Sequence, residues 1–194
     1  MTNHQSKIDF KKKFETVKSF ISSLIQESTL VWNKLNDEKC IRTLAILSFA
    51  KIEVFSCYWS LYNGNSEKKN KEKMITWINK FLLLNKNKVL SDFPHYKKIS
   101  SDDLYQLRCN LMHFFSCTYK TIGISNGDER TLEKCFTDSG VFISNMSFNL
   151  LIYEGAKIML EILLDETNKT ENHKKGIERI YEKIKNEGGL QLNI

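Results

Sequence analysis

The segment Leu104–Phe115, LYQLRCNLMHFF, holds Arg108 and His113 in an otherwise apolar stretch, with four residues between them. An arginine carries a fixed positive charge and a planar fork of donors that fits a phosphate group. A histidine is the side chain that most readily takes up and releases a proton near neutral pH. These two groups are what RNA cleavage without a metal ion needs, so this segment is the first candidate for a catalytic site.

Helical geometry separates the two chemical residues of this segment from its apolar residues. At 100° per residue, the apolar residues fall in one arc about 100° wide that is expected to face the core. These residues are Leu104, Leu107, Leu111, Phe114 and Phe115. His113 lies about 150° from the centre of that arc, which predicts that it points away from the core. Arg108 lies at the edge of the arc, where its long side chain can reach outward, about 7.5 Å from His113 along the axis.

The Arg-x4-His spacing, with Asn110 between the two residues and an aliphatic residue before the histidine, resembles the signature of the HEPN superfamily. The resemblance implies that His113 acts as general base on an RNA 2′-hydroxyl, or as acid on the leaving 5′-oxygen. It implies that Arg108 holds the scissile phosphate and that Asn110 orients the histidine or binds a phosphate oxygen. It implies no metal and no cofactor, because the RNA supplies its own nucleophile.

In that family the functional unit is a homodimer in which two motif helices meet at one cleft. The resemblance therefore implies that RNA is the substrate and that a second copy of the chain binds through the motif helix. It also implies a role as a toxin or phage-defence effector, with an antitoxin or regulatory protein as a further partner. Many members place the polar residue directly after the arginine, whereas this chain has Cys109 there. The alternative is a non-catalytic HEPN-like module that binds RNA, a nucleotide or a protein through the same face.

Apolar residues recur at helical spacing along most of the chain, which predicts the elements that must position the motif. The expected helices span about 7–35, with a break near Ser28–Thr29, then from a cap at Asn36 or Asp37 to 62, 71–85, 102–119, 147–165 and 173–187. Thr121–Ile124 and Val141–Ser144 are β-prone and predict a small hairpin. We expect a single all-α domain, an up-and-down HEPN-like bundle with its core at about 7–165 and a C-terminal accessory helix.

The second expected helix is apolar on nearly every side, which predicts that it is the central helix. Lys51 and Glu53 interrupt it. In many HEPN domains a polar or acidic residue on the second helix faces the motif, so the resemblance makes Glu53 a candidate partner of Arg108. A buried carboxylate with another partner, or a solvent-facing one, is the alternative. Lys51, Glu53 and Cys109 are the residues that we expect to bind RNA or to support the site.

Cys109, His113 and Cys117 form a Cys-x3-His-x3-Cys pattern that resembles a zinc site. Residues eight apart on a helix are separated by about 12 Å, whereas zinc binds each sulfur at about 2.3 Å. A pair of these residues with an outside ligand such as Cys135 or His95 remains open, but we expect no metal. The five cysteines are odd in number and lack a Cys-x-x-Cys pair, which favours reduced, buried thiols.

Length and composition fit one soluble globular domain. The chain has 194 residues, a single proline and eight glycines, which favours long helices over many short strands. Its net charge of +6 fits a polyanionic partner, although lysines at solvated helix ends account for it equally well. No apolar run approaches the roughly 20 residues of a membrane span, and the polar N-terminus has no signal core, so we expect a cytoplasmic protein with no membrane partner. No glycine-rich phosphate loop is present.

Overall fold

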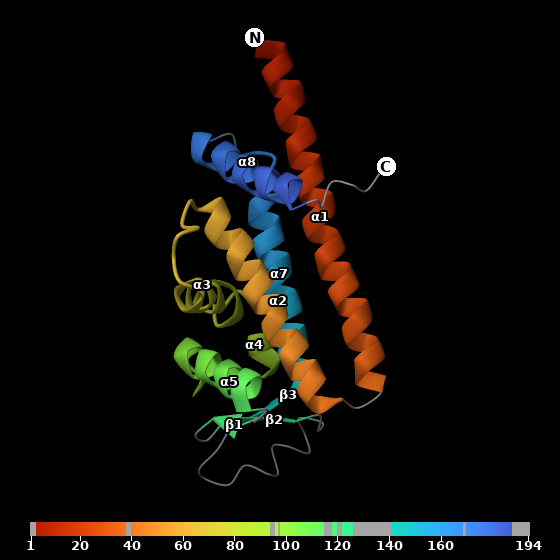
Figure 1. The fold of residues 1–194 in the computed structure, drawn as a ribbon, viewed down its shortest axis with the longest axis vertical. Coiled ribbons are helices and arrows are strands. Elements are labelled where there is room, and N and C mark those ends of the chain that lie inside the picture. Colours follow the sequence, from red (N-terminus) through yellow and green to blue (C-terminus); the bar gives the residue numbers. More distant parts are fainter. Residues whose placement is uncertain are drawn as a thin grey trace.

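The computed structural model describes residues 3–37, 40–93, 96, 98–114, 118–119, 122–125, 141–168 and 170–187. Helices make up most of these residues, and the short strands gather at one end of the molecule (Figure 1). The elements in chain order are α1 (Asn3–Asp37), α2 (Ile41–Tyr62), α3 (Asn70–Trp77), the π-helical turn η1 (Ile78–Leu82), α4 (Val89–Asp92), α5 (Ser101–Phe114), β1 (Thr118–Tyr119), β2 (Ile122–Ser125), β3 (Val141–Ser144), α7 (Asn145–Leu163) and α8 (Glu171–Asn186).

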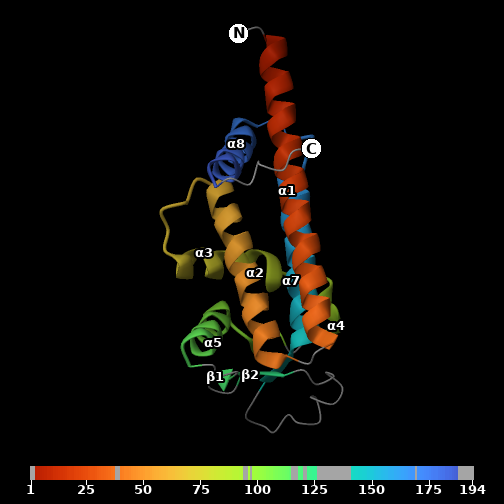
Figure 2. The same cartoon turned by 45° about the vertical axis from the view of Figure 1, so that its right-hand side comes forward.

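Three long helices form the body of the bundle. α2 and α7 run in one direction and α1 in the other, while α8 crosses them near the end where α2 finishes (Figures 1 and 2). α2 contacts α1, α3, α5, α7 and α8, so it is the central helix. The all-α bundle predicted from the sequence is confirmed.

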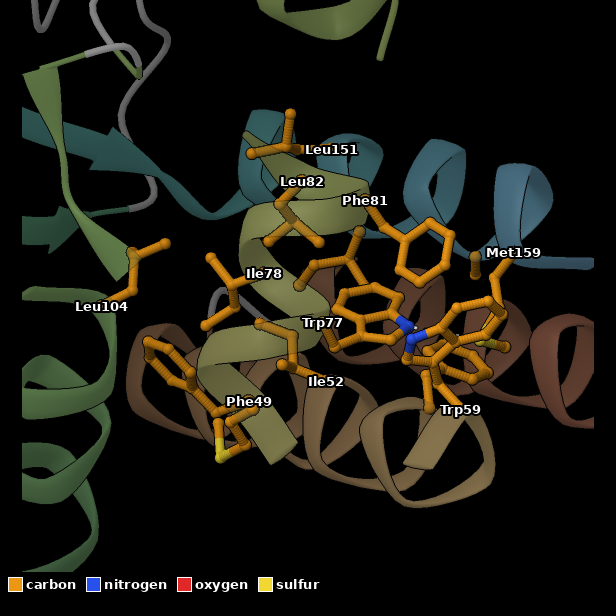
Figure 3. Close-up of a cluster of buried hydrophobic side chains, with 14 of the residues drawn as sticks. Phe49, Ile52, Trp59, Trp77, Ile78, Phe81, Leu82, Leu104, Leu151 and Met159 are labelled. Carbon is orange, nitrogen blue, oxygen red and sulfur yellow. Dashed lines mark hydrogen bonds between the residues drawn. The ribbon is translucent and has the colours of Figure 1, made fainter. Parts of the chain in front are cut away.

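The central part of the core is formed by rings and aliphatic chains from α2, α3, η1 and α7, with Leu104 of α5 nearby (Figure 3). Trp77 stacks on Phe55 with ring centroids 5.8 Å apart, and Trp59 meets the edge of Phe81 at 4.9 Å. The Trp77 indole N–H donates to the Met159 sulfur at 3.2 Å, which gives the buried donor a partner. Burial of this apolar surface is the main driving force for the fold.

Contrary to the expectation that no apolar run approaches the length of a membrane span, α2 could cross a membrane by length and composition, since Arg42–Tyr62 has a mean hydropathy of 1.4. More than half of that window, 56%, is buried inside the protein. A helix surrounded by other helices must be apolar on most sides in a soluble protein as well, so the fold is compatible with a soluble protein.

α1 and the start of α2 differ from the sequence prediction. The expected break near Ser28–Thr29 is absent, because both hydroxyls donate to the Ile25 carbonyl, at 3.0 and 2.8 Å, within a continuous helix. Asn36 and Asp37 do not cap the second helix, because they belong to the end of α1. α2 begins after Cys40, which makes no side-chain capping bond.

The predicted hairpin between the two β-prone segments is wrong in its direction. β2 and β3 pair in parallel, from Ile122 opposite Val141 to Ser125 opposite Ser144, and the antiparallel partner of β2 is β1. The β-propensity of a segment shows that it can join a sheet but not which way its partner runs. α5, the helix that carries Arg108 and His113, was predicted to extend to about residue 119. It ends at Phe114, and Thr118–Tyr119 form β1 instead.

α8 belongs to the common core. Ile177, Ile180 and Ile184 on one face of α8 are buried in the same apolar cluster as the side chains of α1 and α2. The Tyr62 ring at the end of α2 lies only 2.4 Å from the position that a Cβ on Gly176 would take. The close packing of α2 against α8 therefore requires the glycine.

Candidate functional site

The start of α5 is fixed by a capping box. The Ser100 hydroxyl accepts from the Asp103 N–H at 3.1 Å, and the Asp103 carboxylate accepts from the Ser100 N–H at 3.3 Å. This reciprocal pair satisfies backbone donors that the first turn would otherwise leave unpaired. α5 begins at Ser101, one residue before the start predicted at about residue 102, and this start sets the direction in which every later side chain of α5 points.

The apolar face of α5 follows the prediction over its first three turns. Leu104, Leu107 and Leu111 are fully buried, whereas Phe114 is 77% exposed. Phe114 was predicted to face the core, and this is wrong: it lies at the edge of the apolar arc and is the last residue of the helix. The side chain of Phe115 lies outside the described residues.

Arg108 pairs with Glu53 of α2, the partner expected for it. Its Nη2 lies 3.1 Å from Glu53 Oε2, and the two side chains are 19% and 31% exposed. Partial burial alone lowers the pKa of Arg108, but its hydrogen bonds and charge contacts with Glu53 and Cys109 outweigh this and raise it. The guanidinium is thus held charged, half-buried and in one orientation at the α2–α5 contact.

His113 points away from the core, as predicted, and its side chain is exposed. Met112 and Phe114 on either side of it are exposed as well, and the rings of His113 and Phe114 have centroids 6.4 Å apart. Among the described residues, no side chain hydrogen-bonds to its imidazole. The end of α5 therefore presents an accessible imidazole flanked by apolar side chains.

Cys109 and Asn110 are half-buried on the same helix. Cys109 lies against Tyr105, whose pKa is raised by burial and by a hydrogen bond with that thiol. Arg108, Glu53 and Cys109 are therefore brought together. Asn110 lies between this group and His113 along the helix.

Lys51 does not join this group. It is only 6% exposed, and its Nζ donates to the Asn149 Oδ1 of α7 at 2.7 Å. Burial lowers the pKa of Lys51 to about 8. Because its ammonium group faces α7 inside the protein, Lys51 is not placed to bind RNA, and the expectation that it would do so is corrected here.

Two residues of α3 near the motif were not singled out by the sequence. Asn70 Nδ2 lies 3.4 Å from Glu53 Oε1, and Lys71 lies 3.1 Å from Asp102 and over the ring of Tyr105. The lysine-rich stretch that contains Lys71 was visible in the sequence. Its proximity to α5 depends on how α3 packs, which composition does not reveal.

The described residues contain no group of three or more His, Cys, Asp or Glu side chains that could hold a metal ion. The outside zinc ligands left open by the sequence, Cys135 and His95, and Cys117 itself, lie outside the described residues. Cys40 and Cys109 are half-buried and Cys57 is exposed, whereas the sequence favoured buried thiols.

The arrangement can bind an anion at Arg108 and transfer a proton at His113, on one helix and at the protein surface. Glu53 fixes the first group, and the exposed position of the second leaves it free to meet a substrate or a second protein copy. No family model, no curated protein and no solved structure matches this chain.

Proposed function

We propose that this protein is a metal-independent endoribonuclease of the HEPN type, which cleaves single-stranded RNA as a cytoplasmic homodimer formed through α5. One observation carries the proposal: Arg108 is held at the surface by Glu53 while the imidazole of His113, on the same helix, is exposed. A role as a toxin or phage-defence effector, with an antitoxin or regulatory partner, is part of the same proposal and rests on the motif alone.

Arg108 would bind the scissile phosphate. A guanidinium has five N–H donors, and its contacts with Glu53 and Cys109 leave others for the phosphate oxygens. Charge that builds on these oxygens in the transition state would be stabilised by a group that is already oriented. Glu53 acts on the reaction through Arg108 and is thus a positioning residue.

His113 would move the protons. As base it takes the proton of the 2′-hydroxyl, whose oxygen forms a bond to phosphorus as the bond from phosphorus to the 5′-oxygen breaks. The leaving oxygen takes a proton from a protonated imidazole, for which the second copy of His113 in a dimer is available. The products are a 2′,3′-cyclic phosphate and a 5′-hydroxyl, and Asn110 would orient the base or bind a phosphate oxygen.

The side chains around His113 support a dimer. Met112 and Phe114 expose apolar surface beside a polar group, and such surface is commonly buried by a partner. Light scattering of the purified protein tests this directly. We expect a dimer for the natural chain and for Met146→Asp, which alters an exposed residue of α7, and a monomer for Phe114→Asp. A monomeric natural chain would contradict the composite site.

The activity is tested with single-stranded RNA in EDTA. We expect cleavage by the natural protein and a loss of at least about a hundredfold in His113→Ala and Arg108→Ala. Lys185→Ala, an exposed residue of α8, removes the same charge as Arg108→Ala and should cleave normally. Absence of cleavage by the natural protein, or full activity in both site variants, would contradict the proposal.

A second candidate is a non-catalytic module that binds RNA, a nucleotide or a protein through the same face. The ion pair favours it, because a carboxylate 3.1 Å from Arg108 offsets part of the charge that a phosphate would meet. In that case the natural protein would bind RNA without cleaving it, and His113→Ala would bind RNA as tightly as the natural protein does.

A further inference from the structure

A cavity of about 200 Å³ lies away from Arg108, between the C-terminal half of α2, the loop that follows it, and the α3–η1 helix. Three lysines line it, Lys68, Lys73 and Lys80, and no acidic residue does. Trp59 lines it from α2, and the edge contact of its indole with Phe81 (Figure 3) anchors it to the core. The cavity thus combines a rigid aromatic wall with three positive charges.

The three ammonium groups are not neutralised by the protein. In the part of the chain that the structure describes, none of them forms an ion pair with a carboxylate. Lys73 donates to the Ser66 carbonyl at 2.7 Å, which keeps one donor occupied and the charge intact. Lys80 lies 4.3 Å from the centre of the Trp59 ring, a cation–π contact that holds the ammonium beside the cavity. The neighbouring Lys71, by contrast, pairs with Asp102.

Three of the neutral side-chain donors around the cavity are already used within the protein. Ser56 donates to the Glu53 carbonyl at 2.8 Å, and Thr76 to the Glu72 carbonyl at 2.7 Å. The amide of Asn63 donates to the Trp59 carbonyl at 2.7 Å. The lysines are the charged groups among the residues that line the cavity, and they select for negative charge.

The loop that forms one side of the cavity is held in place. Gly64 has φ +72°, a conformation that other residues rarely adopt, and its N–H donates to the Leu61 carbonyl at 3.0 Å. The next residue, Asn65, donates to the Ser60 carbonyl at 2.8 Å, and Arg179 of α8 donates to the Tyr62 carbonyl at 2.9 Å. Lys68 is therefore presented by an ordered turn, which lowers the entropy lost on binding.

We propose that this cavity binds a terminal phosphate group. Three lysines match the dianionic phosphomonoester, with its charge of about −1.5 to −2, better than the single charge of a phosphodiester. The volume is below the range of about 300–1,000 Å³ typical of drug-sized ligands, so the phosphate enters and the rest of the ligand stays outside. The site is independent of Arg108 and His113 and does not rest on the ribonuclease activity.

The same chemistry comes from a free mononucleotide or from the 5′-phosphorylated end of an RNA, and the experiment separates the two. The probes are a short fluorescent 2′-O-methyl oligonucleotide carrying a 5′-phosphate, the same strand with a 5′-hydroxyl, and AMP, adenosine and inorganic phosphate as competitors. The 2′-O-methyl groups remove the nucleophile, so cleavage cannot affect the binding measured by fluorescence anisotropy.

For the natural protein we expect the 5′-phosphorylated strand to bind about tenfold more tightly than the 5′-hydroxyl strand, as an added charge-assisted contact provides. AMP should compete and adenosine should not. If the two strands bind equally, direct binding of AMP by calorimetry that is lost in the variant Lys68→Gln with Lys80→Gln assigns a free monophosphate as the ligand of the cavity. Equal binding of the strands without such binding of AMP overturns the proposal.

Variants locate the binding. Lys68→Gln combined with Lys80→Gln should abolish the tenfold preference for the phosphorylated strand. Lys69→Gln, on the same loop but outside the cavity lining, should keep it. Circular dichroism checks that all variants are folded. If the double variant is not folded, Lys73→Gln is used in its place and should weaken the same preference. If Lys69→Gln loses the preference for the phosphorylated strand to the same extent, general attraction between charges explains the preference, and the proposal is overturned. Because the 2′-O-methyl strands cannot be cleaved, failure here and failure of the nuclease proposal are distinguishable.

Discussion

Lys51 and Glu53 lie two residues apart on α2, yet they belong to different regions of the molecule. Two residues correspond to about 200° around a helix, so the side chains leave on nearly opposite sides. Lys51 is buried against α7 with a neutral amide as its partner, whereas Glu53 is half-buried and pairs with Arg108 of α5. A charged residue in an apolar helix can thus be a structural element or part of a surface site, and the neighbouring helix decides which.

The two pairs also differ in what they contribute. Removing one partner of a buried charge costs stability, because the other group stays desolvated. An ion pair near the surface contributes little to stability but can hold a functional group in position. Variants at the Lys51–Asn149 pair should therefore change the free energy of unfolding, and variants at the Glu53–Arg108 pair should change activity.

The largest effect is expected at Arg108. Arg108→Ala should lower RNA cleavage by about 10²–10³, equivalent to about 3–4 kcal/mol of transition-state stabilisation. Its free energy of unfolding, measured in urea, should change by less than about 1 kcal/mol. Arg108→Lys keeps the charge but loses the planar fork, so we expect only partial recovery. A large loss of stability in Arg108→Ala would show that the Glu53–Arg108 pair contributes to folding stability, as the Lys51–Asn149 pair is expected to do.

The next effect is expected at Asn149. Asn149→Leu removes the hydrogen-bond acceptor of a buried ammonium group and should lower the free energy of unfolding by about 2–3 kcal/mol. The double variant Lys51→Met with Asn149→Leu replaces both partners by apolar groups and should recover most of that loss. Urea unfolding gives both values, and RNA cleavage by the folded variants should stay at the level of the natural protein. An unchanged stability in Asn149→Leu would show that the pair is not buried in solution.

Stability should depend on pH through Lys51. Because the folded pKa of about 8 is below the ordinary value of 10.5, the unfolded chain binds more protons between these two values. The free energy of unfolding should therefore rise with pH in this window, by about 2 kcal/mol between pH 8 and pH 10, relative to Lys51→Met. Unfolding of both proteins in urea across this range measures the difference. A difference that does not change with pH would contradict the lowered pKa.

The smallest effect is expected at Glu53. Glu53→Gln keeps the size of the side chain and removes its charge, so stability should fall by about 1 kcal/mol or less, and less again in high salt. RNA cleavage should fall by about tenfold, because Arg108 loses the group that orients it. Glu67→Gln, an exposed carboxylate of the α2–α3 loop, is the matched control and should leave cleavage unchanged. If Glu53→Gln cleaves as the natural protein does, the carboxylate does not position Arg108.

The sequence predicted the helical elements because these depend on patterns that repeat along the chain, whereas Glu53 was a candidate partner of Arg108 only through the resemblance to the HEPN superfamily. Leu104, Leu107 and Leu111 recur at helical spacing, and the capping residues mark where α5 begins. The sequence did not predict the features that depend on packing between elements. The direction of the β2–β3 pair, the exposure of Phe114 and the burial of Lys51 are set by neighbouring elements and not by local spacing.

The most direct test of the proposed reaction uses an oligonucleotide of deoxyribonucleotides with a single ribose at one internal position, incubated with the protein in EDTA. We expect a single cut on the 3′ side of the ribose, with a 2′,3′-cyclic phosphate on one product and a 5′-hydroxyl on the other, and no cut with His113→Ala. An intact strand, cuts at deoxyribose positions, or products with a 5′-phosphate would contradict attack by the 2′-hydroxyl.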